Sequence, residues 1–128
     1  MKTISKDFQN ITLSNLEEKL KAEFKEIGFG VLHEIDFQET LINKIDKDIN
    51  TFKQLQICNP QLAYAAIQID PTIGIQLPCN VIIRKNQDQL TVDIQSPLDS
   101  IPKSSPEDLR MMATELDDRI SRLLENIN

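Results

Sequence analysis

The chain has 128 residues, of which 40% are hydrophobic and 27% are charged, an ordinary composition for one globular domain. Twenty acidic residues against fourteen lysines and arginines give a net charge of −6, which disfavours partners such as nucleic acid and anionic membranes. Two cysteines and one histidine leave few groups for metal or redox chemistry. We expect a single domain over residues 1–128.

The amino-terminal residues contain no long apolar run, so the sequence predicts neither a signal peptide nor a transmembrane helix. We therefore expect a cytoplasmic protein in which both thiols are reduced. Residues 2–8 are predicted to form an edge strand. A helix is predicted over residues 14–27, because Ser14 and Glu17 fit a capping box, apolar residues recur at helical spacing, and Gly28 supplies a stop.

After Gly28 the apolar residues alternate with a period of two, which predicts a strand. In a regular strand His33 shares the apolar face with Val31 and Ile35, whereas Glu34 and Asp36 share the polar face. A short helix is predicted over residues 39–45, followed by a polar loop and a second core strand over residues 52–58.

The Asn59–Pro60 pair predicts a helix start, with Asn59 as the N-cap and Pro60 in the first turn. This helix should end near Pro71. Residues 74–84 are predicted to form one long strand with an irregularity at Pro78, because proline cannot donate to the ladder. Residues 86–88 should form the turn of a hairpin whose return strand covers residues 90–94.

The last third of the chain predicts a surface connection over residues 96–106 and then a long amphipathic helix that begins at Ser105 to Asp108. The fold class that follows is α+β: a two-layer sandwich, mostly antiparallel, with amphipathic helices on one face. It starts strand-helix-strand and ends in the long helix. A doubly wound βαβ fold is the alternative, and the hairpin argues against it.

Three segments of the sequence resemble a known family. Gly28 to Asp36 is similar to the opening motif of the family catalogued as domain of unknown function three hundred and two. The segments 58–60 and 77–80, Cys-Asn-Pro and Leu-Pro-Cys-Asn, strengthen the resemblance, which covers about residues 10–97. It implies a small α+β domain that forms a homodimer, and it implies no established activity.

Cys58 is the first candidate for chemistry, because a thiol at the mouth of a helix is favoured as thiolate. Cys79 lies on the apolar face of its predicted strand beside Pro78. Either cysteine is also explained as a small buried core residue. If their Cα atoms lie within about 7 Å, the two thiols can form a reversible disulfide.

His33 suits a hydrogen-bonded core position, or a soft-metal site with Cys58 and Cys79 and with Asp36 as an outlying ligand. The spacing of these residues matches no metal template, and no cofactor is implied by any motif. Lysines make the amino-terminal part locally basic and carboxylates make the last helix acidic, which can orient a homodimer or a contact with a basic partner.

Three functional hypotheses follow. The first is a small-ligand or redox-responsive binding protein in which Cys58, Asn59, Cys79 and Asn80 line one pocket. The second is a non-catalytic homodimeric interaction module with structural cysteines, which uses a sheet edge or the long terminal helix. The third is a thiol-dependent enzyme with Cys58 as nucleophile and His33 as base, although no catalytic motif is present.

Overall fold

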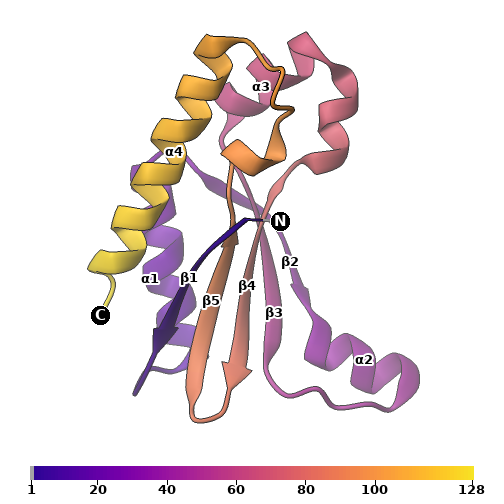
Figure 1. Cartoon of the computed structure of the whole chain (residues 1–128). Coiled ribbons are helices and arrows are strands. Elements are labelled where there is room, and N and C mark those ends of the chain that lie inside the picture. Colours follow the sequence, from indigo (N-terminus) through magenta and orange to yellow (C-terminus); the bar gives the residue numbers. More distant parts are fainter. Residues whose placement is uncertain (1) are drawn as a thin grey trace.

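The structure is a computed structural model that describes residues 2–128 (Figure 1). These residues form five strands, four α-helices and two short 3-10 helices, η1 and η2. In chain order the elements are β1 (Thr3–Phe8), α1 (Leu13–Glu26), β2 (Gly30–Asp36), α2 (Phe37–Ile45), β3 (Phe52–Cys58), α3 (Pro60–Ile69), η1 (Pro71–Gln76), β4 (Cys79–Asn86), β5 (Gln89–Gln95), η2 (Leu98–Ser100) and α4 (Glu107–Asn126).

The strands form one antiparallel sheet in the order β1-β5-β4-β3-β2, which confirms the predicted α+β fold. One face of the sheet, the inner face, is apolar, and α1 and α4 lie side by side against it (Figure 1). Its central residues are Leu55, Ile57, Val81, Ile83, Val92 and Ile94, all fully buried. The opposite, outer face carries mainly polar side chains and no helix layer, as expected for an antiparallel sheet with one wet face.

Helix α1 forms as the apolar spacing predicts, with Leu16, Leu20 and Phe24 fully buried. Its N-cap is Thr12, whose Oγ1 accepts a hydrogen bond from the amide of Asn15, so the helix begins earlier than the Ser14 capping box predicted. The helix ends at Gly28 as expected. Gly28 has a φ of +87°, a conformation that costs any residue with a Cβ atom about 1–2 kcal/mol.

A bulge in β2 makes the prediction for His33 wrong. Val31 pairs with Ile57 but His33 pairs with Gln56, so one extra residue, Leu32, enters the strand between them. The extra residue reverses the alternation beyond it. His33 is therefore exposed on the outer face instead of lying on the apolar face with Val31.

The predicted strand over residues 74–84 is shorter than expected. Asp70 accepts hydrogen bonds from the amide and hydroxyl of Thr72, and Pro71 follows it as the first residue of η1. These caps turn the chain into a 3-10 helix, and β4 begins only at Cys79. Pro78, joined to Leu77 by a cis peptide bond, precedes the strand and does not interrupt it.

Helix α4 begins as predicted near residue 107, but Pro106 occupies the N-cap position and supplies no capping side chain. The other end of α4 is held from β1, where the Lys6 ammonium donates to the carbonyls of Leu124, Glu125 and Ile127 at 2.7–3.1 Å. A cation at this end offsets the negative pole of the helix. Among the helices of residues 2–128, none combines the length and the apolar composition that crossing a bilayer demands.

Candidate functional site

The structure divides the six sequence-predicted site residues among four places. Cys58 ends β3, Asn59 caps α3, and Cys79 and Asn80 begin β4. By alternation along the strands, Cys58 and Asn80 face outward with His33, whereas Cys79 faces the core. Asp36 lies at the other end of β2, where its Oδ1 accepts the amide of Glu39 and caps α2. Cys58, Asn59, Cys79 and Asn80 therefore do not line one pocket.

The start of α3 does not activate the Cys58 thiol. Asn59 uses its Oδ1 to accept the Leu62 amide at 3.0 Å, and its carbonyl accepts the Ala63 amide. Pro60 has no amide hydrogen, so neither the Pro60 nor the Leu62 position of the helix start offers a free amide to a thiolate. Burial raises the pKa of Cys58 above its usual value near 9.0, the opposite of the activation expected from the sequence.

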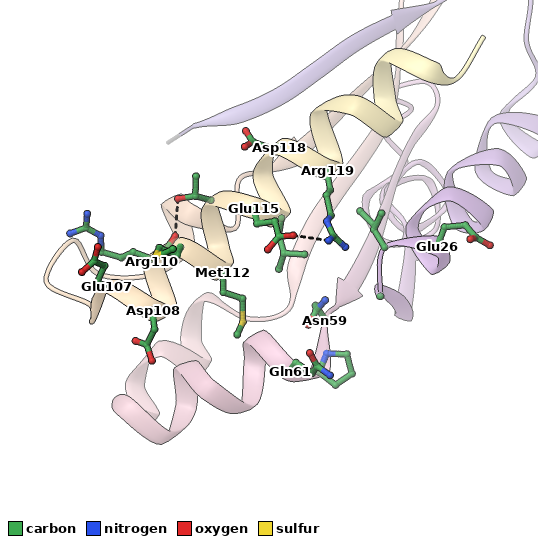
Figure 2. A pocket seen from close by; sticks show the side chains of 16 residues that line it. Glu26, Asn59, Gln61, Glu107, Asp108, Arg110, Met112, Glu115, Asp118 and Arg119 are labelled. Carbon is green, nitrogen blue, oxygen red and sulfur yellow. Dashed lines mark hydrogen bonds and ion pairs between the residues drawn. The ribbon is translucent and has the colours of Figure 1, made fainter.

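Asn59 lines a groove of about 1160 Å³ between the amino-terminal half of α4, the start of α3 and the end of α1 (Figure 2). Gly28 lies at the α1 end of the groove, where a Cβ atom on residue 28 would lie 3.0 Å from the side-chain nitrogen Nδ2 of Asn59. Figure 2 shows Met112 extending from α4 toward α3 and Gln61. The groove walls carry more carboxylates than guanidinium groups, so its charge is negative.

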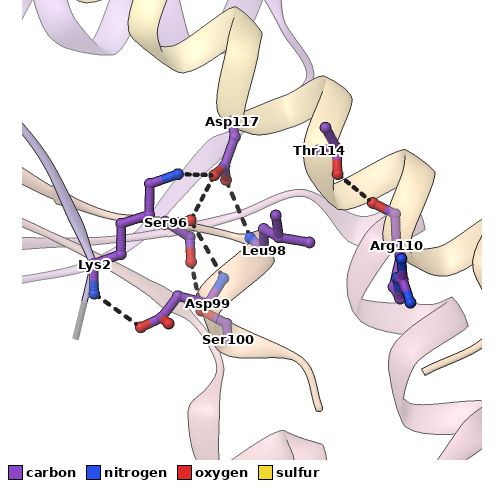
Figure 3. A network of polar contacts seen from close by, with 8 residues as sticks. All are labelled: Lys2, Ser96, Leu98, Asp99, Ser100, Arg110, Thr114 and Asp117. Atoms are coloured by element: carbon purple, nitrogen blue, oxygen red, sulfur yellow. Dashed lines mark hydrogen bonds and ion pairs between the residues drawn. The ribbon is translucent and has the colours of Figure 1, made fainter. Parts of the chain in front are cut away.

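A buried polar network joins α4 to the segment after β5 (Figure 3). Cys79 lies close to two of its members, Asp117 and Ser100. The Asp117 carboxylate, 6% exposed, accepts hydrogen bonds from the Ser96 hydroxyl at 2.6 Å and the Leu98 amide at 3.1 Å. The ammonium of Lys2, the residue before β1, approaches it at 3.7 Å. Burial, with smaller contributions from the Cys58 and Asp117 charges, raises the pKa of Cys79 to about 11. Its thiol is protonated at neutral pH.

The metal and enzyme hypotheses lack an assembled site. Among residues 2–128, no three His, Cys, Asp or Glu side chains converge as metal ligands. Both cysteines are free. His33 stands opposite Gln56, the residue that precedes Cys58 on the outer face of β3, yet the structure records no hydrogen bond between His33 and the Cys58 thiol. The base and nucleophile are not joined.

Sequence reasoning missed a second surface, built around α2. This helix extends from the end of the sheet opposite α3 and buries none of its side chains (Figure 1). Phe37 at its start packs edge-on against Phe52 of β3, with ring centroids 5.7 Å apart. Ile42 and Ile45, three residues apart on one side of α2, are 40% and 60% exposed, and Ile49 in the following loop is 46% exposed. The signal in the sequence was the presence of these apolar residues outside the predicted core positions.

Comparison with known families decides the classification. The family described as domain of unknown function DUF302 matches residues 4–127 of the chain. The chain belongs to the DUF302 family. This confirms the resemblance seen in the Cys-Asn-Pro and Leu-Pro-Cys-Asn segments, and it supplies no activity.

A solved DUF302 structure has the same fold. The chain is similar to the uncharacterized conserved protein DUF302 from Bacillus stearothermophilus, with a TM-score of 0.84 and 22% sequence identity over 98% of this chain and 97% of that one. No curated protein matches the chain. The function of this DUF302 protein must therefore be argued from its own surfaces.

Proposed function

We propose that the protein is a non-catalytic interaction module that works as a homodimer, with α2 and the outer sheet face as its self-association surface. The observation that carries this proposal is α2 itself. A helix of nine residues is marginal in water without tertiary packing, yet no residue of α2 is fully buried, and its aromatic contact with the sheet is that of Phe37 with Phe52. Its exposed isoleucines point to a covering partner.

The free energy that would be gained by burying the exposed isoleucines supports a second copy as that partner. Complete burial of one aliphatic side chain is worth about 1.5–3 kcal/mol, so covering the exposed fractions of Ile42, Ile45 and Ile49 contributes about 3 kcal/mol per copy. A symmetric dimer counts this contribution twice, because each copy offers the same surface. The outer face beside α2 carries the paired Arg84 and Asp93, joined at 2.8 Å, so it presents little uncompensated charge to an acidic copy.

The cysteines support a structural role in this module. Burial raises both thiol pKa values, so neither thiol is poised for exchange at neutral pH. Cys79 fills space in the core beneath α4. The redox-responsive hypothesis loses the lowered pKa on which it depended.

A small-ligand site on the outer face is the second candidate function. The observation that supports it concerns Asn80. The Oδ1 atom of this residue is buried without a hydrogen-bond donor, although its Nδ2 donates to Gln95. Cys58 and His33 share that face. A buried acceptor with no partner is a place for a donor, from a ligand or from the second copy.

Sedimentation velocity of the full chain tests the proposal. The wild type should sediment as a dimer at micromolar concentration, and Ile45→Lys should shift it to monomer because the lysine places a charge in the interface. Ile75→Lys is the matched control, since Ile75 is 84% exposed on η1, at the other end of the sheet. A monomeric wild type, or an Ile45→Lys variant as dimeric as the control, contradicts self-association through α2.

A further inference from the structure

We propose that the groove along α4 binds a basic amphipathic helix of another protein. The groove is bounded by the first half of α4 and by the Gly28 and Asn59–Pro60 junctions, where two chain segments that are distant in sequence meet (Figure 2). This goes beyond self-association, because α2 lies at the opposite end of the sheet.

Part of the groove lining, called here its floor, is apolar and adaptable. It consists of Ile27, Pro60, Met111, Met112 and Leu116. Met111 is 64% exposed although it is apolar. Methionine side chains adjust to different apolar partners because they are unbranched and polarizable, and they recur at surfaces that receive helices. This floor suits the apolar stripe of a helix.

The size of the groove fits a helix better than a metabolite. Small-molecule sites usually enclose about 300–1,000 Å³, whereas this groove has about 1160 Å³ and lies open between α4, the start of α3 and the end of α1. A partner helix is about 10–12 Å wide with its side chains, and an open trough accepts its length without closing around it.

The rim determines the sign of the partner's charge. Its carboxylates are Glu26, Glu107, Asp108, Glu115 and Asp118. Arg119 is already engaged by Glu115 at 2.6 Å, and within residues 2–128 no carboxylate pairs with Arg110, the other cation of the lining. The uncompensated charge is negative, so lysines or arginines flanking the partner's apolar stripe meet complementary charge.

Of the three lysines of this chain's own α1, two are engaged elsewhere. Lys21 is paired with Glu34 at 3.1 Å, and Lys19 donates to the carbonyl of Asn128. A second copy would have to release these contacts to present more than Lys25 to the groove, and each copy carries a net charge of −6. The occupant we infer is therefore a different protein.

Fluorescence anisotropy with a defined peptide tests this inference. The probe is a labelled amphipathic peptide of leucine and lysine, about four helical turns long. We expect saturable binding to the full chain that weakens as salt is added, because exposed charge pairs are screened. The double variant Glu26→Gln/Asp108→Asn should bind about three- to tenfold more weakly, since each exposed pair contributes a few tenths to 1 kcal/mol. Met111→Ser should weaken binding at every salt concentration.

The controls separate the groove from net charge and from self-association. Glu18→Gln/Asp88→Asn removes the same charge outside the groove and should leave the affinity unchanged. A peptide with glutamate in place of lysine should not bind. Equal affinity for both double variants, binding of the glutamate peptide, or no saturable binding would overturn the inference. If Met111→Ser changes the sedimentation of the free protein, the groove is a contact between copies and the inference is wrong, whereas the α2 variants test self-association separately.

Discussion

Replacing Asp117 by alanine should be the most destabilising exchange of a charged residue in this protein. Asp117 is buried between α4 and the segment after β5, where its two oxygens accept from the Ser96 hydroxyl and the Leu98 amide (Figure 3). Hydrogen bonds to a charged group contribute about 1.5–3 kcal/mol each, and the variant leaves both donors buried without an acceptor. The partner Lys2 adds little, because its side chain is 64% exposed. We expect a loss of about 4 kcal/mol from the free energy of unfolding.

Urea unfolding followed by circular dichroism measures this loss. With a slope of about 2 kcal/mol per molar urea, the midpoint should fall by roughly 2 M while the slope stays unchanged. Asp118→Ala is the matched control, since it removes the same charge from the next, exposed position of α4 and should cost less than about 0.5 kcal/mol. Asp117→Asn retains an acceptor and should fall between the two. If Asp117→Ala shifts the midpoint no more than the control does, the network does not fasten α4 as we argue.

Three further predictions concern the junctions and the titrating groups. Gly28→Ala should destabilise the fold by about 1–2 kcal/mol in the same assay, because Gly28 has a positive φ. Gly74→Ala should be close to neutral, since a Cβ atom at Gly74 meets nothing within 4 Å. Equal effects of the two exchanges would refute the strain at Gly28. A hydrogen bond from Lys53 is the largest cause that lowers the pKa of Glu34 below 4.5. The resulting contribution to the free energy of unfolding is complete above pH 4.5 and is lost as the pH falls through the folded pKa. Glu34→Gln should therefore flatten the acid limb of a curve of stability against pH, and an unchanged limb would contradict the assignment. The Cys79 thiol, with a pKa of about 11, should resist alkylation at pH 8 until the protein unfolds, and Cys79→Ser should cost about 1–3 kcal/mol; fast labelling of the native protein would show that the core is open there.

The elements that could be predicted are those with strong local signals. The Asn59–Pro60 helix start is confirmed by the capping bond from the Leu62 amide. The apolar spacing of α1 and the alternation in the β4–β5 hairpin also form as expected, because each buries one face in the same core. Period and capping chemistry act over a few residues, so one sequence is enough to recognise them.

The errors came from changes of register and from tertiary partners. A bulge adds one residue without altering the residue types, so alternation placed His33 on the wrong face. Ile75, Leu77 and Cys79 alternate like a strand, although Asp70–Pro71 is the same kind of helix start as Asn59–Pro60 and would have revealed η1. Cys58 was expected to be activated, because the sequence shows a helix mouth but not which atoms already occupy its amides.

The hydrogen bonds from Lys6 to the end of α4 have a consequence for the order of folding during synthesis. These contacts join residues up to 121 positions apart, and β1 also pairs with β5, which is made late. The first strand therefore has no partner strand until β5 has been made, while β2, β3 and β4 can already pair with α1 in place. Until β1 docks, β5 presents an open edge with unpaired backbone groups, which favours pairing between nascent chains. Conditions that slow this last step should increase aggregation without changing the stability of the finished protein.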